Sequence, residues 1–165
     1  MSRVLIPRVL TAADFAPYGD VIETSSAREL RSINYGYTQR FHDLARLDLA
    51  QAEGVPLLSI FRSSPLPRPL AVKVMERHPL SSQAFFPLDD RPYMVVVAAA
   101  GAFAVENLRA FVASPRQGVN YHAGVWHHFS LALDAPSDFL VIDRGGADKN
   151  CDEVFIEAEN ISIDY

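Results

Sequence analysis

Three of the five histidines lie within seven consecutive residues, at positions His122, His127 and His128, and the single tryptophan lies among them. Imidazole is a common metal ligand, and it is the side chain whose ordinary pKa lies nearest to physiological pH. Such a cluster could hold a transition metal, or supply the acid and the base of a proton transfer. Either use requires further polar residues from elsewhere in the chain.

A second polar group, Glu76, His78 and Gln83, interrupts an otherwise apolar part of the sequence. Residues two apart on a strand point to the same face, so Glu76 and His78 would converge, and Gln83 would come from the following strand. With His127, these side chains offer a carboxylate, an amide oxygen and two imidazoles to a metal ion. Because an amide is a weaker ligand than a carboxylate, a metal-free polar network is the alternative.

Alternation of side chains predicts which of these residues face an interior. In the expected strand 70–78, Glu76 and His78 continue the more apolar face, whereas Lys73 and Arg77 point the opposite way. The sequence therefore places Glu76 and His78 inside and the two cations outside, unless a bulge reverses the faces.

The same argument separates the neighbouring histidines. In the expected strand 127–133, His127 shares the apolar face, while His128 lies on the other face and is expected outside, in packing or in a dimer contact. Gln83 shares its face with Phe85 and is expected inside. His122 falls in a loop, at the mouth of the site or simply beside it.

The elements that must position these residues are short. Apolar runs bounded by Pro and Gly indicate strands and turns, and helical periodicity is sparse. Thr11 is typical of the start of a short helix, 44–52 is a helical turn or a connection, and 24–39 is a loop or an edge strand. This pattern predicts an all-β protein, a sandwich or small barrel with short helices. The expected strands are 57–62, 70–78, 83–87, 94–99, 108–113, 127–133 and 139–143.

Length and composition limit the class of protein. The chain has 165 residues, 49% of them hydrophobic and 21% charged, which is typical of a single globular domain, here 1–165. A net charge of −5 and no cluster of Lys or Arg disfavour nucleic acid and anionic membranes as partners. The N-terminal residues lack the apolar core of a signal peptide. Cys151 has no partner for an internal disulfide, and its acidic neighbours would raise its pKa and disfavour a nucleophilic role.

The two polar groups resemble the two motifs of the cupin family. Glu76-X-His78-X4-Gln83 is similar to His-X-His followed by Glu, and the run from His122 to His127, with Gly124 between, is similar to Pro-X-Gly-X-X-His. Glu76, Gln83 and His122 stand where cupins have His, Glu and Pro. The resemblance implies a cupin-like double-stranded β-helix barrel.

A closer resemblance, to the ureidoglycolate lyase family of allantoin degradation, covers nearly the whole chain. It implies conversion of (S)-ureidoglycolate to glyoxylate and urea by a cytoplasmic homodimer with a cupin-like barrel. It also implies a small-molecule substrate and a divalent metal, nickel or manganese, with no organic cofactor. The segments that carry it are 15–23, 41–45, 75–80, 83–85, 117–122, 125–128 and 139–146.

The residues suit this reaction. Ureidoglycolate carries a hydroxyl and a urea nitrogen on one carbon, so its cleavage needs a base for the hydroxyl proton and an acid for the nitrogen. His127 or Glu76 could be the base, and His78 or His122 the acid. If a metal is bound, His78 and His127 become ligands instead.

The substrate carboxylate needs a cation, and Lys73 and Arg77 are expected on the wrong face. We therefore expect the cation in a loop, either Arg40 with Asn34 nearby, or Arg144. A solvated loop residue is the alternative for Arg40, and a surface ion pair is the alternative for Arg144.

Two other functions fit a cupin-like barrel. One is a non-catalytic sensor that binds small carboxylates, and the other is a metal-dependent oxygenase or isomerase. The residues alone do not distinguish release of urea from release of ammonia.

Overall fold

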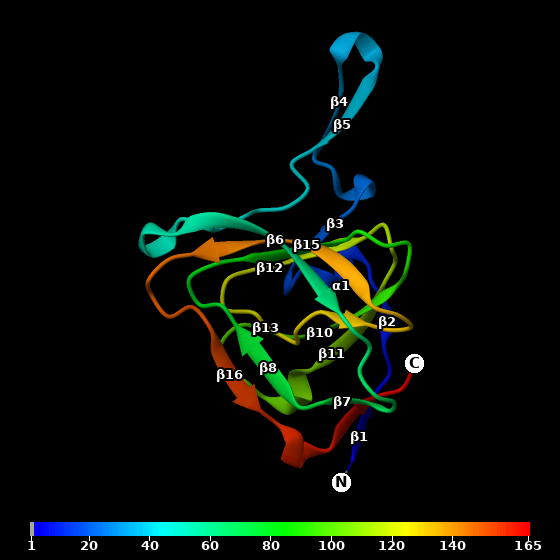
Figure 1. Cartoon of the computed structure of the whole chain (residues 1–165), viewed down its shortest axis with the longest axis vertical. Helices are drawn as coiled ribbons and strands as arrows, with labels where there is room; N and C mark the ends of the chain where they lie inside the picture. Colours follow the sequence, from blue (N-terminus) through cyan, green and yellow to red (C-terminus); the bar gives the residue numbers. More distant parts are fainter. Residues whose placement is uncertain (1) are drawn as a thin grey trace.

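The computed structural model describes residues 2–165, and nearly all of its regular structure is β (Figure 1). Two large sheets face each other. The first has the order β16 (Asp152–Phe155), β8 (Val74–Arg77), β13 (Trp126–His127), β10 (Tyr93–Ala98), β11 (Arg109–Ala113) and β2 (Arg8–Val9), with β14 (Leu131–Ala132) also beside β10. The second has the order β3 (Gly19–Ile22), β12 (Gly118–Tyr121), β9 (Gln83–Pro87), β15 (Ser137–Gly145) and β6 (Val55–Ser63). The all-β, cupin-like fold is confirmed.

Two smaller sheets complete the fold. One joins β1 (Arg3–Leu5), β17 (Ile161–Ile163) and β7 (Leu70–Val72), and the other is the hairpin of β4 (Glu29–Ile33) and β5 (Thr38–His42). This hairpin extends away from the two large sheets (Figure 1). It turns through Asn34 and Tyr35, both with positive φ. The segment 24–39, predicted as a loop or an edge strand, is therefore mostly this hairpin.

Strand β10 separates two apolar cores. Its odd-numbered residues pack in an inner core between the large sheets, and its even-numbered residues pack in an outer core beneath the small β1–β17–β7 sheet. All six residues are at most 3% exposed. Burial on both faces explains why this strand is an unbroken apolar run in the sequence.

The predicted strand 70–78 is interrupted at Lys73. Its first part, β7, pairs with β17, whereas its second part, β8, pairs with β13 and β16. The change of partners reverses the faces, so Leu70 and Val72 share the outer core with Met75 rather than a face with Glu76. The single predicted face was wrong because alternation holds only within one continuous strand.

The predicted strand 127–133 is interrupted in the same way. Only Trp126–His127 and Leu131–Ala132 are strands, so Leu131 and Leu133 pack in the outer core, away from the face of His127. His128, expected outside, is 3% exposed. That prediction was wrong because the chain leaves the sheet at this residue.

The helical predictions had mixed outcomes. Thr11 caps α1 (Ala12–Phe15) as predicted, with its hydroxyl accepting a hydrogen bond from the Asp14 amide at 3.1 Å. The segment 44–52 is mainly a connection that ends in the 3-10 turn Gln51–Glu53. No helix in residues 2–165 is long and apolar enough to cross a membrane. The other 3-10 turns are Thr24–Ser26, Asn34–Gly36, Val105–Asn107 and Glu157–Glu159.

Candidate active site

Three of the predicted residues meet at one end of the inner core. His127 on β13 lies directly opposite Glu76 on β8, and both side chains point between the large sheets. His78 follows β8 and brings its ring centroid to 5.2 Å from that of His127. One potential ligand atom from each of the three residues lies within 4.8 Å of the others. We call Glu76, His78 and His127 the inner triad, and their predicted convergence is confirmed.

Gln83 adjoins the inner triad from β9. Its amide nitrogen donates to Asp143 Oδ2 at 3.2 Å, which turns its oxygen toward His78 Nε2 at 3.1 Å. The other ring nitrogen, His78 Nδ1, lies 2.7 Å from the Asn150 carbonyl oxygen. Both nitrogens of His78 therefore face oxygen acceptors. Such a pair of Nε2 and Oε1 suits a shared proton or a cation bound between them.

His127 is held as a neutral acceptor. Its Nδ1–H donates to the His128 carbonyl oxygen at 3.1 Å, which leaves the lone pair on Nε2. Burial, together with the charge of His78, lowers the pKa of His127 to about 3. His127 Nε2 is fully buried and has no hydrogen-bond partner among residues 2–165. A neutral imidazole with its other nitrogen anchored to a carbonyl is the usual form of a metal-bound histidine, so the donor set fits a divalent ion.

Glu76 has the environment of a proton acceptor. Burial raises its pKa, the charge of His78 opposes this shift, and Glu153 adds to it. Glu76 Oε1 lies 3.8 Å from His127 Nδ1, and Oε2 lies 4.0 Å from Cys151 Sγ. Burial and the nearby carboxylates, first Glu76, raise the pKa of Cys151, which disfavours it as a nucleophile, as predicted.

Tyr121 belongs to the site, although the sequence did not point to it. Its ring lies parallel to that of His127, with 4.1 Å between centroids and 2° between planes. It lies opposite Gln83 in the β12–β9 pair, and no described residue hydrogen-bonds its hydroxyl. Burial and the charge of Glu76 raise its pKa, so the hydroxyl remains a donor. Strand β12 was not predicted, so alternation could not be applied to Tyr121.

A cavity of about 310 Å³ opens beside His78 and Gln83 and contains two cations, Arg144 and Lys149. Arg144 is buried, and its guanidinium donates to the carbonyl oxygens of Gln51 and Ala52 at 2.9 and 2.8 Å. Arg144 thus lines the same cavity as His78 and Gln83, although it lies in β15 rather than in a turn. The remaining lining residues are Ser81, Asp143, Asn150 and Cys151.

His122 lies apart from the inner triad. Its ring is 3.0 Å from Asp20 Oδ2 and lines a separate cavity of about 240 Å³ with Arg46 and Ser82. Burial opposes ionisation of Asp20, but three hydrogen bonds lower its pKa overall. They come from the Asn120 side chain, the Arg46 backbone amide and the His122 ring. His122 is thus the partner of Asp20, and the structure does not bring it to Glu76.

Two other predicted residues lie far from the cavity within one chain. Asn34 and Arg40 are exposed on the β4–β5 hairpin, and the Asn34 side chain donates to Thr38 within that hairpin. The hairpin pairs only with itself and extends outward, so neither residue reaches the inner triad (Figure 1).

The chain is similar to known proteins along nearly its whole length. The family model described as ureidoglycolate lyase matches residues 2–164. A protein of Burkholderia mallei (strain NCTC 10229) named ureidoglycolate lyase is 56% identical over 144 residues, which cover 87% of this chain and 84% of the relative. Proteins of the same name from Burkholderia cepacia (53% over 160 residues, 95% and 90% covered) and Pseudomonas putida (strain W619; 49% over 162 residues, 98% and 96% covered) are also similar.

Proposed function

Since the chain belongs to the ureidoglycolate lyase family, we propose how its inner triad performs the reaction of that family. The protein is a carbon–nitrogen lyase of allantoin degradation that cleaves (S)-ureidoglycolate to glyoxylate and urea. The observation that carries this assignment is the near full-length relationship to proteins of that name. The comparisons favour neither the sensor nor the oxygenase and isomerase alternatives.

Glu76 is the group that moves the proton. It takes the proton of the substrate hydroxyl, the carbonyl of glyoxylate forms, the carbon–nitrogen bond breaks, and Glu76 returns the proton to the departing urea nitrogen. One carboxylate can do both because the hydroxyl and the nitrogen share one carbon. Its raised pKa brings it closer to the operating pH, where such transfer is most efficient. His127, with its pKa of about 3 and its buried ring, is a poor base.

The remaining polar residues hold and orient. A divalent ion, nickel or manganese, would be held by His78, Gln83 and His127 beside Glu76, and when bound it would polarise and acidify the substrate hydroxyl. His78 and His127 are then positioning residues, and Tyr121 fixes the plane of the His127 ring. This arrangement uses the weak amide ligand Gln83 at the side nearest to the cavity.

The substrate carboxylate binds between Arg144 and Lys149. Both line the cavity beside His78, and the buried guanidinium of Arg144 is fixed by two backbone carbonyls. A fixed cation costs little further ordering when the anion arrives. Lys149 is mostly exposed and is free to approach the ligand, since its one ion pair, with Asp152, is 3.7 Å long.

The enzyme acts as a homodimer through the β4–β5 hairpin and the adjoining β6. Large apolar side chains are exposed on both elements, and contiguous exposed apolar surface marks interaction sites. The exposed apolar residues are Leu30, Ile33, Tyr35, Tyr37, Phe41, Val55, Leu57, Leu58, Ile60 and Phe61. Asn34 and Arg40 then belong to this interface.

A cytoplasmic location of the enzyme stays a prediction.

Product analysis tests the function. Purified protein, dialysed against a chelator and then supplied with Ni²⁺, Mn²⁺ or no metal, is incubated with (S)-ureidoglycolate. We expect equal amounts of glyoxylate and urea. Release of ammonia would show a hydrolase, and no product under any metal condition would overturn the assignment.

A further inference from the structure

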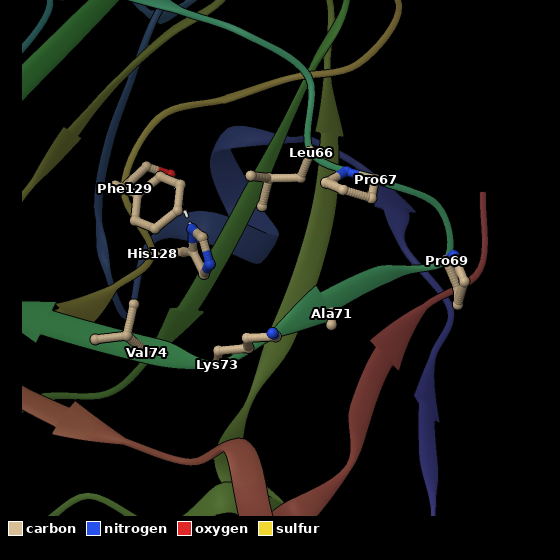
Figure 2. Close-up of a pocket in the computed structure, with 8 residues that line it drawn as sticks. All are labelled: Leu66, Pro67, Pro69, Ala71, Lys73, Val74, His128 and Phe129. Carbon is tan, nitrogen blue, oxygen red and sulfur yellow. Dashed lines mark hydrogen bonds between the residues drawn. The ribbon is translucent and has the colours of Figure 1, made fainter.

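A third cavity, of about 460 Å³, lies outside the inner triad and its mouth (Figure 2). It is bounded by the loop that precedes β7, by the junction of β7 and β8, and by the segment that follows β13. Its volume is within the range of small-molecule sites. Six of its lining residues are apolar and two are polar: Leu66, Pro67, Pro69, Ala71, Val74, Phe129, Lys73 and His128.

His128 offers this cavity an unpaired acceptor. It is 3% exposed, and its Nδ1–H donates to the Phe129 carbonyl oxygen at 3.1 Å, so the lone pair is on Nε2. No described residue hydrogen-bonds His128 Nε2. A ligand N–H or O–H that enters the cavity could therefore donate to this nitrogen.

Lys73 offers the same cavity an unpaired cation. It is exposed at the interruption between β7 and β8, and none of the ion pairs in residues 2–165 includes it. Figure 2 shows the His128 ring and the Lys73 side chain approaching from different elements, with Leu66 and Pro67 on the loop beyond them. The site therefore combines one donor, one acceptor and an apolar wall.

We propose that this cavity binds a small aromatic carboxylate that carries an N–H group. The carboxylate pairs with Lys73, the N–H donates to His128 Nε2, and the ring packs against Leu66, Val74 and Phe129. Few but specific polar groups on an apolar wall are typical of small-molecule sites. None of these residues has a part in the proposed cleavage reaction, so this proposal stands independently of it.

Calorimetric titration of the full-length protein with indole-3-acetate tests the proposal, because this probe has the ring, the N–H and the carboxylate. We expect one molecule bound per chain. Naphthalene-1-acetate, which lacks the N–H, should bind about tenfold more weakly because it cannot donate a hydrogen bond to His128 Nε2. Tryptophol, which lacks the carboxylate, should bind about threefold more weakly, as expected for a solvent-exposed charge pair.

Two variants place the binding in this cavity. Lys73→Met should weaken indole-3-acetate about threefold and leave tryptophol unchanged. Arg116→Met removes the same charge at the exposed β11–β12 turn and should change neither ligand. The proposal is overturned if indole-3-acetate does not bind, which is the result expected if a second copy of the chain fills the cavity. It is also overturned if Lys73→Met has no effect, or if saturating glyoxylate displaces the probe, which would place it in the mouth of the active site.

Discussion

His127 and His128 are adjacent in the chain, yet they belong to two different regions. Both rings are buried, both donate Nδ1–H to the carbonyl of the next residue, and both are neutral with a free Nε2. His127 faces Glu76, His78 and the stacked ring of Tyr121, whereas His128 faces an apolar cavity. The same hydrogen bond from Nδ1–H thus leaves Nε2 as an acceptor in both rings. The side chains around each ring decide whether that acceptor belongs to a reactive cluster or to a binding site.

The largest expected effect separates Glu76 from an adjacent carboxylate. Glu76→Gln keeps the shape of the side chain but removes the proton acceptor, so we expect kcat to fall about a thousandfold. Glu153→Gln is the control, because Glu153 lies opposite Glu76 on β16 but is exposed. Its kcat should stay within about twofold of the parent. Near-normal activity in Glu76→Gln, with folding checked by circular dichroism, would exclude Glu76 as the proton carrier.

The two histidines are compared directly by replacing each with Phe, which keeps a planar ring. His127→Phe removes a metal ligand and should lower kcat about a hundredfold, with loss of bound nickel or manganese measured on dialysed protein. His128→Phe should keep activity within about threefold. Each variant should lose about 1 kcal/mol of unfolding free energy, because one buried carbonyl loses its donor. Equal loss of activity in both variants would show that the two histidines do not differ in function.

The two buried tyrosines extend the comparison with a smaller effect. Tyr121→Phe keeps the stack on His127 but removes the unpaired hydroxyl near Glu76, so we expect about a tenfold lower kcat and little change in stability. Tyr93→Phe removes a hydroxyl that donates to the Gln117 carbonyl oxygen at 2.7 Å. It should cost about 1 kcal/mol of unfolding free energy and leave kcat unchanged. If Tyr93→Phe lowered kcat and Tyr121→Phe lowered only stability, Tyr93 would be the tyrosine that takes part in the reaction.

The last comparison concerns stability in acid rather than activity. The pKa values of His127 and His128 are lowered to about 3 and about 4 from 6.5, so the unfolded chain binds more protons between these values. Their stabilising contribution is complete above pH 6.5 and is lost as the pH falls toward 4, by up to about 1.4 kcal/mol per pH unit for each ring.

Melting temperature against pH measures this effect. His128→Phe and His127→Phe should each give a shallower decline between pH 6.5 and pH 4 than the parent protein. Only His128→Phe should do so with activity retained. A decline as steep as that of the parent in both variants would show that neither ring is buried in its neutral form.

The sequence brought Glu76 and His127 together because alternation holds within β8 and within β13, which pair at these two residues. His78 follows β8 and still reaches them. It failed for His128 and for the face of Leu70 because the chain changes sheets at Lys73 and leaves the sheet after His127. Such changes depend on contacts that are distant in the sequence. Arg40 was predicted near the substrate for a similar reason, since the sequence does not show that the β4–β5 hairpin extends away from the large sheets.

The parallel pairing of β1 with β17 also bears on how the protein folds. Arg3 pairs with Ile161, so one of the first strands to be synthesised waits for the last before it can enter its sheet. Until then the outer face of β10 lacks the small sheet that covers it. Contacts of such long sequence separation slow folding. The chain therefore spends its synthesis with an apolar face uncovered, and a chaperone that shields this face should raise the yield of folded enzyme.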